Sequence, residues 1–240
     1  MKVIIDSQQL RQKGEDITII LQEVIDNKMD DYVIFPREIS YYVGYFNISN
    51  DLHNNKFMYS NHESRSYIIQ MADGLYTLKK YFNEIKTHIA NNGDNPSHIN
   101  YTYYEFNGTI KISVTPPYTF SILQHQTQLL GFNNPQVIAN HALSSNPVNF
   151  IPHKMLYIHL KQLKNSDIYI NNSKSDILAT VPVTAGEFGT LVNYKFGLPH
   201  ANELVNTTIN CLELTITDEN NNIIDFHGMP VFYTLEICKK

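Results

Sequence analysis

The sequence has no tryptophan, only two cysteines and few charged side chains, which make up 17% of its 240 residues. Two cysteines, Cys211 and Cys238, cannot form the disulfide framework that holds small secreted domains together, so we interpret them as buried free thiols. Lysine and arginine never occur in runs longer than two, and the formal net charge is -5. This charge pattern argues against nucleic acid as a partner.

Long apolar runs are also missing from the sequence. A transmembrane helix needs roughly 18 or more consecutive apolar residues, so we expect no membrane span. The opening segment, Met-Lys-Val-Ile-Ile-Asp, is too short and becomes polar too soon to be a signal peptide. We therefore expect a protein that is made without a secretory signal.

Motifs that carry chemistry are equally scarce. The sequence contains no glycine-rich phosphate loop, no nucleophile elbow and no Cys-X-X-Cys pair. His153 and His159 would lie on one face of a strand but roughly 20 Å apart, too far to share a metal ion. Asp218 and Asp225 fall in predicted turns, where carboxylates accept local hydrogen bonds. We therefore predict no catalytic, cofactor-binding or metal-binding residues and no enzyme activity, although two carboxylates distant in sequence could still pair as in glycosidases.

Asparagine and isoleucine are the residues that the sequence has in abundance, at 27 and 28 copies. Asparagine suits turns because it tolerates the left-handed backbone conformation, and β-branched isoleucine suits strands. The hydrophobic fraction of 42% is enough for a packed core. The same composition is also typical of an AT-rich genome, and both interpretations stay open.

Alternating apolar and polar residues, bounded by turn residues, predict many short antiparallel strands. One hairpin is marked by Asn107-Gly108, a pair that is typical of a type I′ turn. The predicted strands cover residues 16–21, 32–35, 41–46, 57–59, 67–71, 101–106, 109–114, 155–161, 177–183, 212–218 and 231–237. In the last two strands the alternation predicts that one face is buried, with core residues Leu214, Ile216, Leu235 and Ile237.

One segment, residues 77–90, has the period of an α-helix. Its apolar residues recur at helical spacing, after Thr77 as a possible N-cap and before an Asn-Asn-Gly stop signal at 91–93. We interpret this helix as a plug over an open end of the sheets. A second, shorter helix is predicted over 126–132, closing at Gly131.

These elements predict an all-β fold, a β-sandwich or jelly roll, with one inserted α-helix near 77–90. We expect residues 1–240 to form a single jelly-roll-type domain with insertions. An alternative is a subdivision into 1–135 and 150–240. The segment between them, 133–152, is rich in Asn, Ser and Pro without periodicity and predicts a linker or long loop.

The C-terminal motifs carry a family resemblance. A turn, Thr-Asp-Glu-Asn at 217–220, precedes Ile-Asp-Phe-His-Gly-Met-Pro at 224–230 and a last strand, Phe-Tyr-Thr-Leu-Glu-Ile at 232–237. Three shorter motifs lie upstream, namely Gly-Leu-Tyr-Thr at 74–77, Leu-Leu-Gly-Phe at 129–132 and Val-Pro-Val at 181–183. In this order they resemble the minor capsid (penton) proteins of Maverick/Polinton elements, adintoviruses and virophages.

The resemblance implies a virion protein with a jelly-roll fold and insertions, assembling as a ring at icosahedral vertices. It further implies self-association as a homo-pentamer or trimer, the major capsid protein as partner, and no cofactor. The resemblance runs from about residue 70 to the C-terminus. The first 70 residues match no motif of the group, and the chain is shorter than many members, so the exact vertex role stays open.

Two other classes of function remain as alternatives. The first is a lectin-like β-sandwich that binds a ligand or attaches to a host through exposed Tyr and Asn side chains, of which the sixteen tyrosines supply many. Tyrosines are also ordinary strand residues whose hydroxyl reaches water. The second is an enzyme built on a β-scaffold.

Overall fold

A computed structural model describes residues 2–6, 17–26, 31–151, 153–165, 169–170, 173–174, 176–183, 186–197, 201–205 and 207–240. The chain divides into two compact units. Unit 1 takes both ends of the chain, Met1–Tyr45 and His153–Lys240, and unit 2 is the middle segment Phe46–Pro152. This division differs from the predicted subdivision into 1–135 and 150–240, because residues 32–41 pair with residues 231–239 near the C-terminus.

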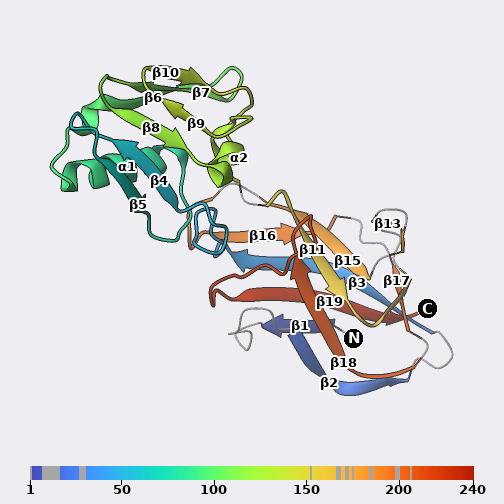
Figure 1. Ribbon diagram of the computed structural model, residues 1–240. Helices are drawn as coiled ribbons and strands as arrows, with labels where there is room; N and C mark the ends of the chain where they lie inside the picture. Colours follow the sequence, from blue (N-terminus) through green and yellow to red (C-terminus); the bar gives the residue numbers. More distant parts are fainter. Residues whose placement is uncertain are drawn as a thin grey trace. The chain divides into compact units, whose positions relative to one another are not determined.

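Unit 1 consists of two larger antiparallel sheets and a short hairpin (Figure 1). The first sheet has the order β1-β19-β3-β17-β12, with β16 also paired to β3, and the second has the order β15-β11-β18-β2. The small hairpin is β13-β14. The strands are β1 Lys2–Asp6, β2 Ile17–Asp26, β3 Tyr32–Tyr42, β11 Met155–Leu160, β12 Leu163–Asn165, β13 Tyr169–Ile170, β14 Ser173–Lys174, β15 Ile177–Pro182, β16 Leu191–Lys195, β17 Asn202–Leu204, β18 Thr208–Thr217 and β19 Val231–Lys239.

The strand order of these two sheets is that of a jelly roll. In chain order the strands occupy eight positions, where β16 and β17 together count as the sixth. The positions are β1, β2, β3, β11, β15, β16/β17, β18 and β19. The first, eighth, third and sixth positions are neighbours in one sheet, and the second, seventh, fourth and fifth in the other. Two packed sheets that share eight strand positions in this interleaved order are the arrangement of a jelly roll, and the short β12 is an addition at the edge of the first sheet. The predicted all-β, jelly-roll fold class is therefore confirmed.

The core of unit 1 comes from the alternating faces of these strands. In β18 the apolar residues Leu212, Leu214 and Ile216 are buried, and in β19 the same holds for Val231, Tyr233, Leu235 and Ile237. The four core residues predicted from the alternation, Leu214, Ile216, Leu235 and Ile237, are all confirmed as buried. The pattern succeeds because each strand has one face toward the core and one away from it.

Strand β3 is one strand of 11 residues, so the prediction of two strands at 32–35 and 41–46 was wrong. The reason is a β-bulge at Arg37. On β19, Thr234 pairs with Glu38 and Leu235 pairs with Pro36, so Arg37 is an extra residue in the register. A bulge accommodates a proline, which has no N–H to donate to the ladder, within a strand that continues on both sides.

Unit 2 has two smaller antiparallel sheets, with the orders β5-β4-β8-β9 and β10-β7-β6, and two α-helices. Its strands are β4 Lys56–Ser60, β5 Ser66–Gln70, β6 Ile99–Tyr104, β7 Thr109–Val114, β8 Thr119–Ile122, β9 Gln136–Ile138 and β10 His141–Leu143. Its helices are α1 Leu78–Asn91 and α2 Thr127–Leu130, with the 3-10 turns η2 Pro96–His98 and η3 Gln124–Gln126.

Helix α1 confirms the helix predicted near 77–90 and its start at Thr77. The Thr77 side chain accepts a hydrogen bond from the Lys80 amide at 3.2 Å, and the helix is capped at its end by Asn92. Its buried residues, Tyr81, Phe82, Ile85 and Ile89, belong to the core of unit 2 together with strand residues such as Phe57 and Phe120. Figure 1 shows the helix alongside β4 and β5. The helix thus supplies part of the core of unit 2, and the interpretation of a plug over open sheet ends stays a prediction.

The β6–β7 hairpin exists, but its turn differs from the predicted type I′ turn. Tyr104 pairs with Thr109, which leaves a loop of residues 105–108 instead of two central residues. Gly108 has a φ of +69°, whereas Asn107 has no positive φ, and type I′ needs both. The Gly108 amide donates to the Tyr104 carbonyl oxygen at 2.8 Å and closes the loop.

The segment 133–152, predicted as a linker or long loop, has regular structure in part. It contains the short strands β9 and β10, while Pro152 itself lies outside the described residues. Backbone hydrogen bonds tie its later part to α2, since Asn146 donates to Gly131 and Asn149 to Leu129, both at 2.9 Å. Gly131 ends the helix at a φ of +75°, as predicted, and a side chain there would meet the Asn146 carbonyl oxygen. Strands of three residues are too short to show a period, so sequence reasoning missed them.

Candidate functional site

The described ranges contain neither a cluster of metal ligands nor a membrane-spanning helix. These ranges hold no group of three or more His, Cys, Asp or Glu side chains that could bind a metal ion. No helix among them has the length and apolar character needed to cross a bilayer. Cys211 and Cys238 are free thiols, but each is half-buried, not fully buried as predicted. That the chain has no catalytic, cofactor or metal site stays a prediction.

The two histidines singled out from the sequence lie apart, each beside its own carboxylate. His159, in β11, contacts Asp176 at 2.7 Å through Nδ1 and the Thr217 hydroxyl at 2.9 Å through Nε2. His153 precedes β11, and its Nδ1 is 3.7 Å from Asp218 Oδ2. The structure thus brings each histidine to a structural partner and does not bring the two together.

The predicted role of the acidic turn residues is confirmed. Asp218 Oδ1 accepts hydrogen bonds from the amides of Asn220 and Asn222, each at 2.8 Å. Asp225 Oδ1 accepts one from the His227 amide at 2.7 Å. These are local bonds that shape the connection between β18 and β19, so the two carboxylates act on their own turns.

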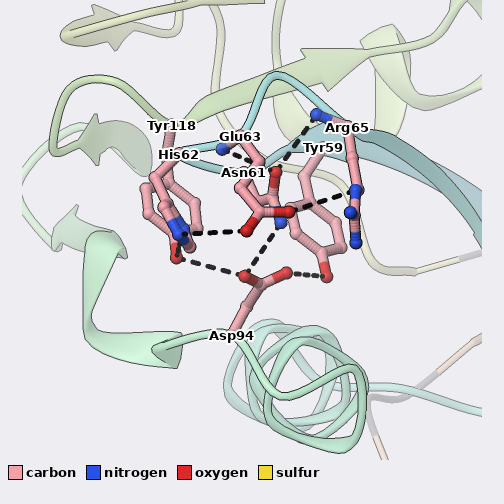
Figure 2. A network of polar contacts seen from close by, with 7 residues as sticks. All are labelled: Tyr59, Asn61, His62, Glu63, Arg65, Asp94 and Tyr118. Atoms are coloured by element: carbon pink, nitrogen blue, oxygen red, sulfur yellow. Dashed lines mark hydrogen bonds and ion pairs between the residues drawn. The ribbon is translucent and has the colours of Figure 1, made fainter.

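A buried polar network in unit 2 was not predicted. It centres on Asp94, which is only 8% exposed and follows the end of α1 (Figure 2). The Asp94 carboxylate accepts hydrogen bonds from the Tyr59 hydroxyl at 2.9 Å, the Asn61 amide at 3.2 Å and the Tyr118 hydroxyl at 3.3 Å. The network joins the β4–β5 hairpin, the segment before β8 and the end of the helix.

The local backbone explains why Asp94 turns inward. Gly93 has a φ of +82°, which reverses the chain after α1, and the Asp94 amide then donates to the Ile89 carbonyl oxygen at 3.2 Å. Left-handed glycine after a helix is the usual way to close its C-terminal turn. Sequence reasoning took this segment as a stop signal only, because the partners of Asp94 lie 24 to 35 residues away along the chain.

The same network orders the exposed loop after β4. Asn61 Oδ1 accepts from the amides of Glu63 and Arg65 at 3.0 and 3.1 Å, and these two side chains form an ion pair at the surface (Figure 2). Burial, together with the neighbouring Asp94 carboxylate, raises the pKa of Tyr59 and of Tyr118 above the usual value. Both hydroxyls therefore stay protonated as donors. Because the Asp94 carboxylate already accepts hydrogen bonds from Tyr59, Asn61 and Tyr118, we interpret it as a structural group that holds these segments together.

A groove on the β10-β7-β6 sheet is the other candidate site. It encloses about 380 Å³ and is lined by Tyr104, Phe106, Asn107, Thr109, Lys111, His141 and Leu143. Its residues come from the β6–β7 hairpin and from β10, which pairs with β7. Aromatic and aliphatic walls with a few polar groups are typical of ligand sites. Of these residues, only Asn107 stood out in the sequence, as a turn signal.

Comparisons with known proteins show a likeness in fold without a match in sequence. No protein-family model matches the chain, and no curated protein matches it significantly. The crystal structure of the mavirus penton protein is similar at a TM-score of 0.52 and 10% identity, over 100% of both chains. A chain of the Sputnik virophage, seen by electron cryo-microscopy, gives a TM-score of 0.48 and 11% identity over 100% of this chain and 98% of that one. The expected resemblance to virophage penton proteins is confirmed at the level of the fold.

Proposed function

We propose that this chain is a structural virion protein, a penton-like minor capsid protein that assembles at icosahedral vertices. The observation that carries the proposal is the likeness in fold to the mavirus penton protein, which extends over the whole of both chains. The order of the sequence motifs, from Gly-Leu-Tyr-Thr at 74–77 to the last strand, supports the same assignment independently of the fold. The protein then acts by assembly, without catalytic turnover or a cofactor.

The domain organisation that we propose is one jelly roll with a large insertion. Unit 1 has the complete strand order of a jelly roll, and unit 2 enters the chain between β3 and β11. Unit 2 has a hydrophobic core of its own, which contains helix α1. The jelly roll is suited to a capsid shell because its two sheets cover each other and leave their ends and edges for neighbours.

A ring of identical copies needs two different surfaces that fit each other. Unit 1 exposes large apolar side chains on both of its larger sheets. Val24, on the end strand β2 of one sheet, is 62% exposed, and Leu191, at the start of β16 on the other, is 46% exposed. We propose that the surface around Val24 of one copy contacts the surface around Leu191 of the next copy in the ring. The further partner is the major capsid protein, and the location is the virion.

Native mass spectrometry of the purified chain at micromolar concentration tests the self-association. The proposal expects a closed ring, a homo-pentamer or trimer. Val24→Glu and Leu191→Glu should each shift the population to monomers while the circular dichroism spectrum stays unchanged. The matched control is Ile68→Glu, which places the same charge on a side chain of unit 2 that is 71% exposed. A strict monomer, or rings that survive both substitutions, would contradict the proposed contact.

A further inference from the structure

We propose that the groove on the β10-β7-β6 sheet binds a saccharide that carries a carboxylate, of the sialic or uronic acid class. This is a binding function in addition to assembly, and it does not depend on the capsid role. The volume of about 380 Å³ lies within the range of ligand pockets, about 300–1,000 Å³. The argument rests on which side chains share this face and on what they offer.

The register of the sheet places the lining residues on its outer face. Ile110 and Ile112 of β7 are fully buried, so the residues that alternate with them, Thr109 and Lys111, point the other way. Lys111 pairs with Leu143 of β10, and Thr109 pairs with Tyr104 of β6. The groove is therefore built on regular strands, with one wall supplied by the hairpin turn.

The apolar wall is formed by exposed rings and an exposed aliphatic side chain. Phe106 is 85% exposed and Leu143 is 58% exposed. The Phe106 ring meets the Tyr104 ring edge to face, with 6.0 Å between the centroids. The face of an aromatic ring carries partial negative charge and attracts the positively polarised C–H groups on one face of a sugar ring. An exposed phenyl ring beside a groove is thus a platform for a pyranose.

The turn that carries Phe106 is held in place from several sides. Asn107 Oδ1 accepts from the Thr109 amide at 3.1 Å and from the Thr109 hydroxyl at 2.7 Å. The Val148 amide donates to the Gly108 carbonyl oxygen at 2.9 Å, so the segment after β10 supports the turn. A ring on a fixed turn loses little conformational entropy on binding.

The polar groups of the groove select for negative charge. Its lining includes the ammonium group of Lys111 and the imidazole of His141 but no carboxylate. Within the described part of the chain, Lys111 has no ion-pair partner, and the Asn107 Nδ2 group has no acceptor. A carboxylate on the ligand would supply the missing partner of Lys111, and sugar hydroxyls would accept from Asn107. Charge complementarity therefore favours an acidic saccharide over a neutral one.

The test is saturation-transfer-difference NMR on the full chain, with sialyllactose and lactose as probes. We expect sialyllactose to bind at least about tenfold more tightly than lactose, because only the former has a carboxylate for Lys111. Equal binding of the two sugars, or no binding of sialyllactose, would overturn the proposal.

Variants locate the binding in the groove. Phe106→Ala should weaken sialyllactose binding by about three- to tenfold, and Phe106→Tyr, which keeps the ring, should retain it. Lys111→Gln should remove the preference for sialyllactose over lactose. The matched controls are Ile68→Ala and Lys79→Gln, exposed side chains of unit 2 outside the groove, which should leave binding unchanged. Unchanged binding in Phe106→Ala and Lys111→Gln would place the sugar elsewhere and overturn the assignment.

Discussion

Asp94 is a buried carboxylate on which three segments of unit 2 depend. Its donors, Tyr59, Asn61 and Tyr118, come from strands and loops that are distant in sequence. Hydrogen bonds to a charged group are worth more than neutral ones, and a buried donor that loses its partner costs free energy. The stability of unit 2 should therefore be sensitive to this one side chain.

Asp94→Ala should lower the free energy of unfolding by about 2–3 kcal/mol, because it leaves the hydroxyls of Tyr59 and Tyr118 without their acceptor. Urea unfolding followed by circular dichroism measures the loss. The control is Glu63→Ala, since Glu63 is in the same network but pairs at the surface with Arg65. That control should change the stability by less than about 1 kcal/mol. A comparable loss in both variants would contradict the central role of Asp94.

His153 and Asp218 form a partly buried pair that makes unit 1 sensitive to acid. Burial lowers the pKa of His153, although the nearby carboxylates of Asp218 and Glu219 oppose this. Burial acts to raise the pKa of Asp218, but hydrogen bonds from Asn222 and Asn220 and the nearby His153 outweigh it and hold that pKa below its usual value. In both cases the unfolded chain takes up its proton at a higher pH than the folded chain.

The free energy of unfolding should consequently decrease as pH falls, in two separate pH ranges, one for His153 and one for Asp218. Between the unfolded histidine pKa of about 6.5 and the lower folded value, protons bind to the unfolded chain first, so His153 reduces stability as pH falls. Asp218 adds a second loss as pH falls from its unfolded pKa through the lower folded one. His153→Gln should flatten the dependence as pH falls below about 6.5, measured by urea unfolding. An unchanged slope in His153→Gln would refute the assignment.

At the scale of elements, strand β19 is an interior strand of its sheet, between β1 and β3. Leu235 is 1% exposed there, so Leu235→Ala should lower the free energy of unfolding by about 2–5 kcal/mol. Thr234→Ala, on the other face of the same strand, should cost less than about 1 kcal/mol. Chemical denaturation measures both. A loss below about 0.5 kcal/mol for Leu235→Ala would mean that the strand register is different.

The elements also show which parts of the fold local sequence can predict. Helix α1 was predictable because its period, the Thr77 cap and the Asn-Asn-Gly end all lie within the segment itself. That β3 is one continuous strand was not predictable, because the bulge at Arg37 is defined by pairing with β19, about 200 residues further along the chain. Strands β9 and β10 were missed because three residues are too few to show the alternation of a strand.

At the scale of the whole molecule, alternation along the strands was enough to predict the fold class, and motif order was enough to indicate the family of folds. The division into two units was beyond reach, because it depends on the pairing of β1, β2 and β3 with β18 and β19, about 200 residues further along the chain. The groove was equally hidden. Its lining combines β6, β7 and β10, and only the register of the folded sheet brings Tyr104, Lys111 and Leu143 to one face.

The central claim is that the chain is a vertex protein of a capsid, and its location in assembled particles tests this most directly. The chain is co-expressed with the major capsid protein from the same genome, and purified particles are reconstructed by electron cryo-microscopy. We predict density for this jelly roll at the icosahedral vertices, arranged as a ring, and nowhere else in the shell. The claim would be contradicted if the co-expressed particles do not incorporate the chain, or if they carry it on their faces instead of at their vertices.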